Sequence, residues 1–412
     1  MSLAALTALP RTVLHLADEA SIELRAAYRL QRAGLLPGPF EVPTVAEAAV
    51  GGGGAALTEV LSARFGEHVA IVDEGVPMSY RDLSLKTRRC MNVFADIAES
   101  SGRDRPTIGV MCRNSGLVVV AILAALSSGV RLVFLNTDMG RRQLETVCER
   151  EQLDVILHDA EFAERLAEAV DCRRVLVKGA PQPTPGAKKK ADDADDAPET
   201  LDALLAAAAT TAPPRSAIKP EMVILTSGSS GVPRGAARRD SQKTVLSTMA
   251  GMLEKIPLRR ADVIYLAPPA FHGWGLITTL IGLMAGATLV FDGRFDAQRA
   301  VRTMREQECT VFVAVPTMLS RVMALPDEEL APLAGQLRII GSGGARLEPS
   351  LVGRVQETFG HVLHNFYGAT ELSYITIATP DDLKNDPTCA GSPPLGVTVA
   401  IIGDGKRLGP GQ

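Results

Sequence analysis

The sequence is poor in aromatic residues and has no large excess of charge of either sign. Aromatic side chains make up 4% of the 412 residues, and the formal net charge is −4. Surfaces that stack bases need aromatic rings, and phosphate backbones attract basic proteins, so the composition argues against nucleic-acid binding. Apolar residues at 46% and charged residues at 22% are typical of a globular protein, here long enough for two or three subdomains.

The chain also lacks paired cysteines, a signal peptide and a long uninterrupted apolar run. No two of its six cysteines form a C-x-x-C pair, which predicts buried free thiols in a reducing compartment and neither disulfides nor zinc. The first apolar stretch is interrupted by Asp18, Glu19 and Glu23. The longest apolar runs, 117–126 and 276–291, are respectively too short and too interrupted to span a bilayer. We therefore predict a cytoplasmic protein.

Two common nucleotide-binding motifs are missing. No G-K-[ST] completes a Walker loop, and no G-x-G-x-x-G opens a predicted helix. Instead, residues 226–236 read TSGSSGVPRGA and follow a short apolar run, 222–225, that predicts a buried strand. Glycines let main-chain N–H groups turn toward an anion, hydroxyls donate to it, and arginine adds a fixed charge. A flexible Ser/Gly turn is the alternative, but the preceding strand and the Pro–Arg pair favour a polyphosphate-binding loop.

This loop resembles the phosphate loop of the adenylate-forming enzymes, which include acyl-CoA synthetases, amino-acid adenylation domains and luciferases. Most members have lysine where this chain has Arg234. The positive charge is kept, but the compact ammonium is replaced by a planar guanidinium. The resemblance covers roughly residues 55–405. It implies that the following residues bind phosphates, with the first and last also taking part in catalysis: Thr226, Ser227, Gly228, Ser229, Ser230, Gly231 and Arg234.

A second motif, FYGATE at 366–371, is similar to the Tyr–Gly–x–Thr–Glu element of the same family. The resemblance implies that Tyr367 offers a flat face to adenine and that Gly368 lets the main chain approach it. Phe366 and Gly368 belong with Tyr367 to the implied cofactor-binding residues. The resemblance assigns Thr370 to a phosphate oxygen and Glu371 to Mg²⁺, for which carboxylate oxygens are suitable ligands. Both are predicted catalytic residues.

The segment GSGGARL, 341–347, follows a predicted strand and resembles the adenine-binding turn of the family. Gly343, Gly344 and Ala345 would present main-chain groups to the base. A glycine-rich strand–helix connection without a ligand would look similar. Asn365 is a further candidate for a hydrogen bond to the adenine edge.

His272, in APPAFHGWGL, matches the family position beside the acyl carboxylate and is the remaining predicted catalytic residue. An isolated histidine is more often structural. Here Trp274 and two flanking glycines follow it, which suits a mobile gate to an apolar pocket. No carboxylate lies between Pro268 and Leu280 to pair a substrate ammonium, so an amino-acid substrate is disfavoured and a simple carboxylic acid fits better.

The order of elements predicts an α/β fold, because strands alternate with helices as in parallel sheets with crossover connections. Expected strands are 69–73, 107–112, 130–135, 155–158, 222–225, 263–266, 310–315, 337–341 and 362–365. We expect two α/β subdomains with mainly parallel sheets plus the start of a small β subdomain, as in the large N-terminal domain of acyl-CoA synthetases. The predicted divisions are 1–54 (helix and flexible joint), 55–180 (first subdomain), 181–219 (low-complexity linker loop), 220–395 (second subdomain with the AMP-binding motifs) and 396–412 (start of the β subdomain).

An amphipathic helix is predicted over 11–33, followed by a glycine-rich joint at 51–54. Its arginines allow peripheral contact with an anionic membrane, but acidic residues share the helix. Docking on its own domain, or on a second subunit in a homodimer, is the favoured interpretation.

By resemblance, the reaction has two steps: a fatty (medium- or long-chain) carboxylate attacks the α-phosphorus of ATP with Mg²⁺, and the thiol of coenzyme A then attacks the acyl-adenylate. The family's C-terminal lid, with its catalytic lysine, has no counterpart in the sequence. We therefore expect the N-terminal region of a longer fatty-acid–CoA ligase, impaired on its own. Two alternatives are an acyl-AMP ligase that delivers to a carrier protein and a catalytically weak adenylate-binding module.

Overall fold

A computed structural model describes the chain over residues 47, 55–179, 198–226, 234–237, 251–270, 272–369 and 373–409. Of residues 226, 234–237 and 373 it describes the backbone alone. The helix predicted over 11–33, the joint at 51–54 and the low-complexity stretch at 180–197 lie outside these residues. So do Ser227, Gly228, Ser229, Ser230, Gly231, Thr370 and Glu371 of the predicted site.

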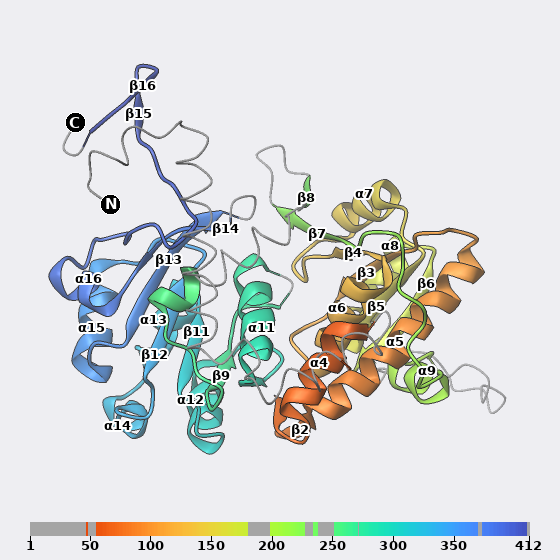
Figure 1. The fold of residues 1–412 in the computed structure, drawn as a ribbon, viewed down its shortest axis with the longest axis horizontal. Coiled ribbons are helices and arrows are strands. Elements are labelled where there is room, and N and C mark those ends of the chain that lie inside the picture. The colour runs from red at the N-terminus through yellow and green to blue at the C-terminus, as the bar shows by residue number, and fades with distance from the viewer. Residues whose placement is uncertain are drawn as a thin grey trace, which may run out of the picture.

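The described strands form two large sheets and a small hairpin (Figure 1). The larger sheet has eight strands in the order β14-β13-β12-β11-β9-β10-β1-β2. All neighbours are parallel except the two edge pairs, β13–β14 and β1–β2. Its strands are β1 (Val69–Asp73), β2 (Val76–Ser79), β9 (Val263–Leu266), β10 (Thr288–Phe291), β11 (Val311–Ala314), β12 (Ile339–Gly343), β13 (Leu363–Ala369) and β14 (Ser373–Ala378).

The second sheet has six strands in the order β6-β5-β3-β4-β7-β8 and is parallel except for the final pair. Its strands are β3 (Thr107–Met111), β4 (Arg131–Phe134), β5 (Val155–Asp159), β6 (Arg173–Lys178), β7 (Glu221–Thr226) and β8 (Arg234–Ala237). Strands β3 and β5 are buried along their whole length, as expected for parallel strands covered on both faces.

Helices cover the outer face of each sheet and fill the space between the sheets. A continuous core joins β1 and β9 of one sheet to β3 and β4 of the other through α4, α5, α6 and α11, which lie in the middle of the molecule in Figure 1. A second core lies on the other face of the eight-stranded sheet, and a third beneath α7 and α8. The principal helices are α4 (Ala56–Phe65), α5 (Tyr80–Ser101), α6 (Gly116–Ser128), α7 (Arg141–Glu151), α8 (Ala163–Ala169), α9 (Leu201–Ala207), α11 (Gly273–Ala285), α12 (Ala297–Glu306), α13 (Pro316–Val322), α14 (Asp327–Leu330), α15 (Pro349–Phe359) and α16 (Pro380–Asn385).

The sequence of α6 explains its central place. GLVVVAILAALSS carries no charge, and Val118 through Ala125 are all buried. A helix that is apolar all round must be surrounded by protein. Ser115 caps its first turn by accepting a hydrogen bond from the main-chain N–H of Val118 (3.3 Å), and the left-handed Gly129 ends it.

The architecture confirms the predicted α/β fold with two mainly parallel sheets and a short β element at the end. The sheets do not follow the predicted residue ranges, however. Strands β1 and β2, from the range 55–180, pair with β10, whereas β7 and β8, from the range 220–395, extend the six-stranded sheet. The predicted division therefore describes the order of α/β units along the chain and not the membership of the sheets. The domain boundaries themselves stay a prediction.

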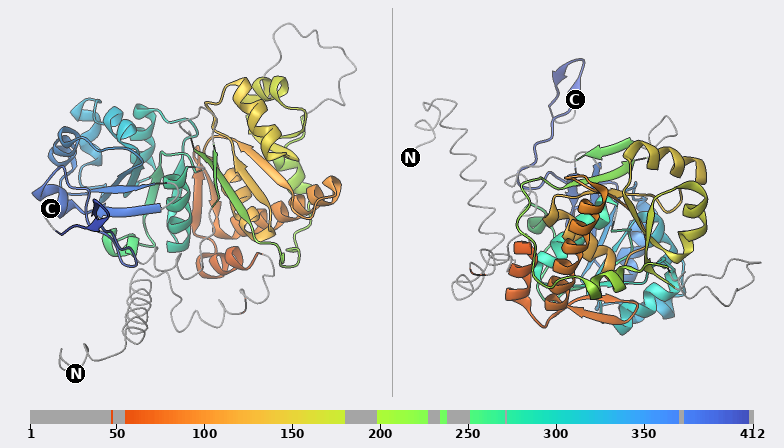
Figure 2. Two further views of the ribbon diagram at one scale, coloured as in Figure 1. Left: turned by 90° about the horizontal axis from the view of Figure 1, so that it is seen from above. Right: turned by 90° about the vertical axis from the view of Figure 1, so that its right-hand side faces the viewer.

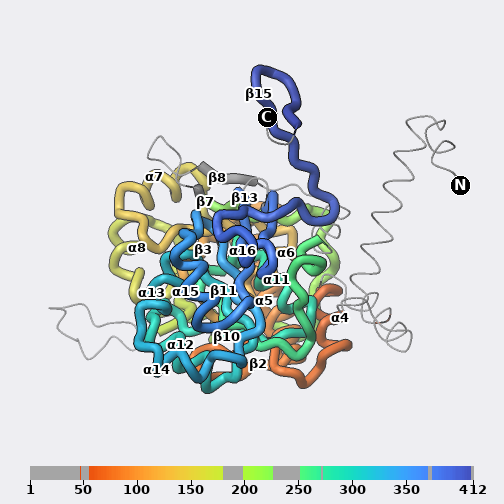
Figure 3. The backbone as a smooth tube through the Cα atoms, turned by 90° about the vertical axis from the view of Figure 1, so that its left-hand side faces the viewer, coloured from red at the N-terminus to blue at the C-terminus, as the bar shows by residue number. Residues whose placement is uncertain are grey.

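Near the C-terminal end, β15 (Ile402–Gly403) and β16 (Lys406–Arg407) form a short hairpin that projects from the body of the protein (Figures 1 and 3). Ile401 and Ile402 expose 63% and 60% of their surface there. Figure 2 shows the hairpin on the side of the molecule where β13 and β14 lie. In the part of the chain that the structure describes, every helix is too short or too polar to cross a membrane.

Candidate functional site

The predicted site residues of the eight-stranded sheet lie at one edge of that sheet. Strands β9, β11, β12 and β13 are mutually parallel, so their carboxyl ends meet at the same edge. His272 follows β9, Gly343 ends β12, and Phe366, Tyr367 and Gly368 lie in the last part of β13. In open α/β sheets, ligands bind at the carboxyl ends of the strands.

Two strand ends differ from the prediction. Strand β12 continues to Gly343, so the first part of the expected turn at 341–347 is sheet, and the bend begins at Gly344 with φ +87°. A positive φ is accessible to glycine at little cost. Strand β13 continues through Gly368 to Ala369 because β14 pairs with it in antiparallel fashion, and the register shifts between Tyr367 and Gly368. Such an irregularity twists the strand and re-aims nearby side chains.

The two faces of β13 carry different kinds of side chain. Phe366 points into the core between the sheets, where it is 5% exposed. Asn365 and Tyr367 alternate to the opposite face, and Tyr367 exposes 55% of its surface. The strand therefore separates a polar, open half-site from an apolar half-site.

The polar half-site contains two buried atoms without a hydrogen-bond partner among the described residues. Asn365 Oδ1 and Ser342 Oγ both lack one, and their residues are paired across β12 and β13. An unsatisfied buried polar group costs about 1–3 kcal/mol. Beside them, Gly344 and Ala345 are exposed at the bend. This surface suits a flat ligand with hydrogen-bonding edges. It offers the exposed ring of Tyr367, two polar side-chain atoms without a partner, and main-chain groups at the bend.

The apolar half-site is organised around Trp274. Its ring centroid lies 4.1 Å from that of Phe366, and its Nε1–H donates to the main-chain oxygen of Ala314 (3.1 Å). The indole also lies against two glycines of β12: a Cβ added at Gly341 would come within 3.3 Å of Cζ2, and one at Gly343 within 3.5 Å of Cδ2. The glycines thus leave room for the ring, which covers this face of the sheet.

His272 precedes the first turn of α11 and lies at the surface. Its main-chain N–H donates to Pro269 O (2.9 Å), and its carbonyl accepts from the N–H of Leu276 (2.7 Å). Gly275 packs so closely beneath this bend that a Cβ there would lie 2.0 Å from Pro269 O. Partial desolvation lowers the pKa of the His272 ring below its usual value, so the ring is held toward its neutral form.

The predicted phosphate loop connects β7 and β8 of the six-stranded sheet. The two strands are antiparallel, and Thr226 stands opposite Arg234 in the register. The backbone therefore brings the first and last residues of the loop together, while the residues between them lie outside the described part of the chain. The loop and the FYGATE strand come from different sheets.

One residue that holds the main chain next to the site was not predicted. Asn114, in the connection from β3 to α6, is 4% exposed and bonds the main chain just before His272. Its sequence context, Arg–Asn–Ser–Gly after a strand, contains no local signal for that role. Ser342 was not predicted either, because its importance depends on its pairing with Asn365.

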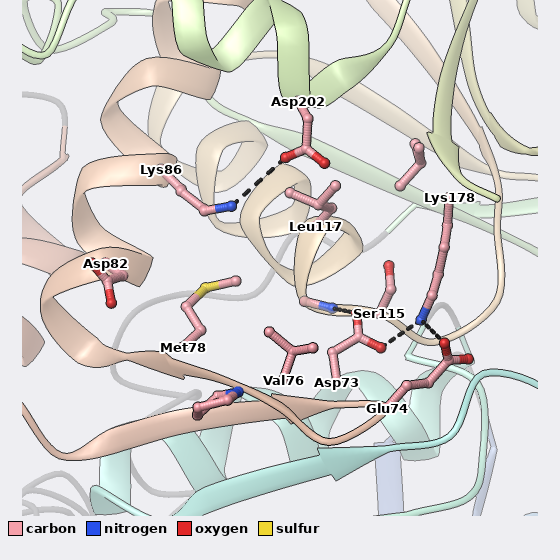
Figure 4. A pocket seen from close by; sticks show the side chains of 13 residues that line it. Asp73, Glu74, Val76, Met78, Asp82, Lys86, Ser115, Leu117, Lys178 and Asp202 are labelled. Atoms are coloured by element: carbon pink, nitrogen blue, oxygen red, sulfur yellow. Dashed lines mark hydrogen bonds and ion pairs between the residues drawn. The ribbon is translucent and has the colours of Figure 1, made fainter. Parts of the chain in front are cut away.

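A separate cavity of about 410 Å³ lies where β1 and β2 meet α5, α6 and α9 (Figure 4). Lys178 Nζ lies 2.6 Å from Asp73 Oδ1 and 3.2 Å from Glu74 Oε2, and Asp73 Oδ2 also accepts from the N–H of Gly116 (2.9 Å). Partial burial disfavours the charged form of Lys178, but the carboxylates of Asp73 and Glu74 outweigh that effect and raise its pKa. None of the predicted site residues lines this cavity. The Asp73–Lys178–Glu74 cluster joins β1 of the eight-stranded sheet to β6 and α6 of the six-stranded sheet. Its role is therefore structural.

Glu371, the predicted ligand of Mg²⁺, lies outside the described residues. Within the part of the chain that the structure does describe, no three His, Cys, Asp or Glu side chains are grouped to hold a metal ion.

Two solved structures illustrate the fold that this chain shares. The o-succinylbenzoate CoA synthetase MenE of Bacillus subtilis, in complex with its acyl-adenylate, matches with a TM-score of 0.67 at 20% identity, over 86% of this chain and 67% of that one. The N-terminal domain of FACL13 from Mycobacterium tuberculosis matches with a TM-score of 0.71 at 20% identity, over 86% of both chains. These similarities establish the fold.

A model of the AMP-binding enzyme family matches residues 58–412. The chain belongs to this family, as the phosphate loop and FYGATE predicted. Curated relatives at 26% identity are the mitochondrial malonate–CoA ligase ACSF3 of Bos taurus (83% of this chain, 58% of the relative), the 2-succinylbenzoate–CoA ligase of Bacillus licheniformis (78% and 63%) and the 4-hydroxybenzoate–CoA/benzoate–CoA ligase of Rhodopseudomonas palustris (82% and 61%). The chain thus spans about three-fifths of the length of these relatives.

Proposed function

We propose that this chain is the nucleotide- and acid-binding part of an AMP-forming carboxylic acid–CoA ligase. The observation that carries the proposal is the two-sided strand β13. It presents Asn365 and Tyr367 on one face and Phe366, against Trp274, on the other. An acyl-adenylate has a flat, polar adenosine end and an apolar acyl end, so a strand edge between two such half-sites suits it.

In this proposal the polar half-site holds the adenine of ATP. Tyr367 stacks on the base, and Asn365 Oδ1 accepts from the exocyclic amino group, which would satisfy an atom that otherwise lacks a partner. The exposed bend at Gly344 and Ala345 brings main-chain groups to the base edge. The hairpin loop between Thr226 and Arg234 binds the phosphates, with Thr370 as a further donor and Glu371 as the ligand of Mg²⁺.

In this reaction the residues of the site mainly position the two substrates and neutralise the charge of the phosphates. A carboxylic acid is already ionised near neutral pH, so its attack on the α-phosphorus needs no general base. Loop N–H groups and Arg234 would stabilise the charge that develops on the phosphate oxygens, and His272 would lie beside the reacting carboxylate. Coenzyme A then accepts the acyl group. An acyl carrier protein is the alternative acceptor, and a weakly catalytic adenylate-binding module is the alternative outside catalysis.

The sequence suggested a medium- or long-chain fatty acid as the substrate, and this stays a candidate. A second candidate, a compact acid, is supported by the indole of Trp274, which occupies the face of β12 beside the acyl half-site. Relatives named as ligases of malonate, 2-succinylbenzoate and benzoate are consistent with it. We favour the compact acid, because a ring held by a hydrogen bond and an aromatic contact must move before a long chain enters.

The proposal leaves the surroundings of the protein as predictions: a cytoplasmic location, homodimerisation through the 11–33 helix and peripheral membrane contact of that helix. One relative is mitochondrial by name, so the compartment needs its own measurement.

The experiment that tests the proposed function is thermal unfolding of this chain with acyl-sulfamoyl-adenosines, which are stable mimics of acyl-adenylates. The panel carries acetyl, malonyl, benzoyl, hexanoyl and dodecanoyl groups. A ligand at about 100 times its Kd adds about 2.7 kcal/mol to stability, which is easily visible. A stabilisation that peaks with a compact acyl group supports the proposal, a peak at dodecanoyl returns the fatty-acid candidate, and no stabilisation by any mimic contradicts it.

A further inference from the structure

We propose that Asn114 is a positioning residue, which holds the main chain before His272 in place from the opposite sheet. Asn114 lies in the connection between β3 and α6 and is 4% exposed. The hydrogen bonds of its side chain to described residues go to the main chain. These bonds reach residues 266–270, the part of the β9–α11 connection that leads to His272.

Three hydrogen bonds join the Asn114 amide to this short stretch of main chain. Nδ2 donates to the carbonyl oxygens of Leu266 (3.2 Å) and Pro268 (2.9 Å), and Oδ1 accepts from the N–H of Ala270 (2.6 Å). A carboxylate of the same shape lacks both donors, and an aliphatic side chain lacks all three interactions. The set of bonds is therefore specific to a primary amide.

The sequence of the stretch explains why it needs a partner from outside. Pro268 and Pro269 have no N–H and take the chain out of the sheet directly after β9. The carbonyl oxygens of Leu266 and Pro268 are then left in a buried environment, where an unpaired main-chain group is costly. Asn114 supplies the missing donors, and through its Oδ1 it fixes where the chain turns at Ala270.

Asn114 can act as a fixed support because its own main chain is anchored on both sides. The N–H of Arg113 donates to Asp159 Oδ2 (2.7 Å) at the end of β5. Ser115 caps α6, and the N–H of Gly116 donates to Asp73 Oδ2 (2.9 Å) at the end of β1. The support therefore connects both sheets.

Past Ala270 the bend is closely packed. His272 donates to Pro269 O, and Gly275 lies directly against the same carbonyl. A shift of the stretch held by Asn114 would consequently move His272 on the acid side of the site. Strands β12 and β13, which form the nucleotide half-site, have their own ladder of main-chain bonds and would keep their places. This inference rests on the proposed function, since it assumes that the acyl group lies beside His272.

The test compares two ligands, hexanoyl-sulfamoyl-adenosine and AMP, on wild type, Asn114→Ala and Asn114→Asp. Because Asn114→Ala removes three hydrogen bonds that hold the bend on the acyl side of the site, we expect it to weaken the acyl-adenylate mimic by about tenfold or more, and AMP by less than about twofold. Asn114→Asp keeps the acceptor for Ala270 but loses both donations, and we expect it to shift the same ratio in the same direction. Unchanged AMP affinity shows that each variant is folded.

Asn92→Ala is the matched control. Asn92 also ties a helix to a distant main-chain segment, because its Nδ2 donates to Ala209 O (3.0 Å) and Thr211 O (2.9 Å), but that segment lies before β7 and is not next to a predicted site residue. It should leave the ratio of the two Kd values unchanged. If Asn114→Ala and Asn114→Asp leave the ratio unchanged too, or weaken both ligands equally, Asn114 has no positioning role. If wild type binds neither ligand, the proposed function itself fails.

Discussion

The rings of Trp274 and Phe366 pack with their centroids 4.1 Å apart, which joins the start of α11 to the strand that carries Tyr367. One aromatic contact thus connects the acid half-site to the nucleotide half-site. Trp274 is also the only tryptophan of the sequence, so its fluorescence would report on this contact alone.

Trp274→Ala should change which acids bind. Removal of the indole opens the face of β12 over Gly341 and Gly343, and each further methylene buried there contributes about 0.8 kcal/mol. We expect the preference among acyl-sulfamoyl-adenosines to move toward longer chains, with dodecanoyl gaining about tenfold or more over acetyl relative to wild type. Titration of both ligands measures this. Trp274→Phe, which keeps a ring, should stay close to wild type, and an unchanged preference in Trp274→Ala would show that the indole does not limit the pocket.

The affinity for an anionic ligand should depend on pH through His272. Desolvation lowers the pKa of the His272 ring in the protein without ligand, so the ring is neutral at pH 7.5. An anion bound beside the ring favours the imidazolium and raises its pKa, so binding takes up a proton and strengthens as pH falls. We expect the affinity for hexanoyl-sulfamoyl-adenosine to rise about 3- to 10-fold from pH 8 to pH 5.5. His272→Ala should flatten that profile. A profile that His272→Ala leaves intact places the ring away from the ligand.

The sequence predicts those parts of the fold that depend on interactions between residues close together in the chain. Local patterns predicted β1 at 69–73 and β9 at 263–266 with the bounds that the structure has, because a short apolar run and the residues that bound it act over a few residues. The pairing of β1 with β10 could not be predicted in this way. Ile71 faces Leu289, a residue far along the chain, and nothing in the local pattern specifies that partner.

The site shows the same division. The loop at 226–236 and FYGATE were recognised as motifs, and they identified the family. Asn114 was missed because its partners are main-chain atoms 152 to 156 residues away, whose identity is not written in any side chain. Strand β14 was missed as well. Its antiparallel pairing extends β13 past the predicted end at Asn365 to Ala369.

Lys178 should contribute to stability through its ion pairs with Asp73 and Glu74, which link the two sheets (Figure 4). Its ammonium joins Asp73 and Glu74, and Lys178→Met leaves the partly buried Asp73 carboxylate with only the Gly116 N–H. Since hydrogen bonds to charged groups contribute about 1.5–3 kcal/mol and these groups are partly solvated, we expect a loss of about 1–2 kcal/mol in urea unfolding.

Lys86→Met is the control for Lys178→Met. Lys86 lines the same cavity, but its Nζ lies 3.7 Å from Oδ1 of an exposed Asp202. Lys86→Met should change the unfolding free energy by less than about 0.5 kcal/mol. Equal effects of the two substitutions would mean that the Asp73–Lys178–Glu74 cluster has no special role.

Asp159 should make the protein less stable as pH rises. Burial raises the pKa of this carboxyl to about 6 from an ordinary value of 3.8. Its Oδ1 has no hydrogen-bond partner among the described residues. Between these two values the folded chain binds a proton that the unfolded chain does not, so this group lowers stability as pH increases, and above pH 6 its penalty is constant.

Asp159→Asn removes that titration while an oxygen still accepts from the Arg113 N–H. The stability of the variant relative to wild type should increase by about 1–2 kcal/mol between pH 5 and pH 7.5, in denaturant titrations at the two pH values. Parallel changes in variant and wild type would rule out an ionised, unsatisfied Asp159.

The central claim is that the exposed face of β13 binds the adenosine part of an acyl-adenylate, and Tyr367 tests it most directly. Isothermal titration would compare benzoyl-sulfamoyl-adenosine on wild type, Tyr367→Ala and Ile402→Ala, the last being a control at a similarly exposed apolar position on the projecting hairpin. Stacking of a base on an aromatic ring is worth about 1–3 kcal/mol, so we predict one site per chain, a Kd raised roughly 5- to 150-fold by Tyr367→Ala, and no change with Ile402→Ala. Saturable binding that Tyr367→Ala leaves untouched, or no binding to wild type, would contradict the account.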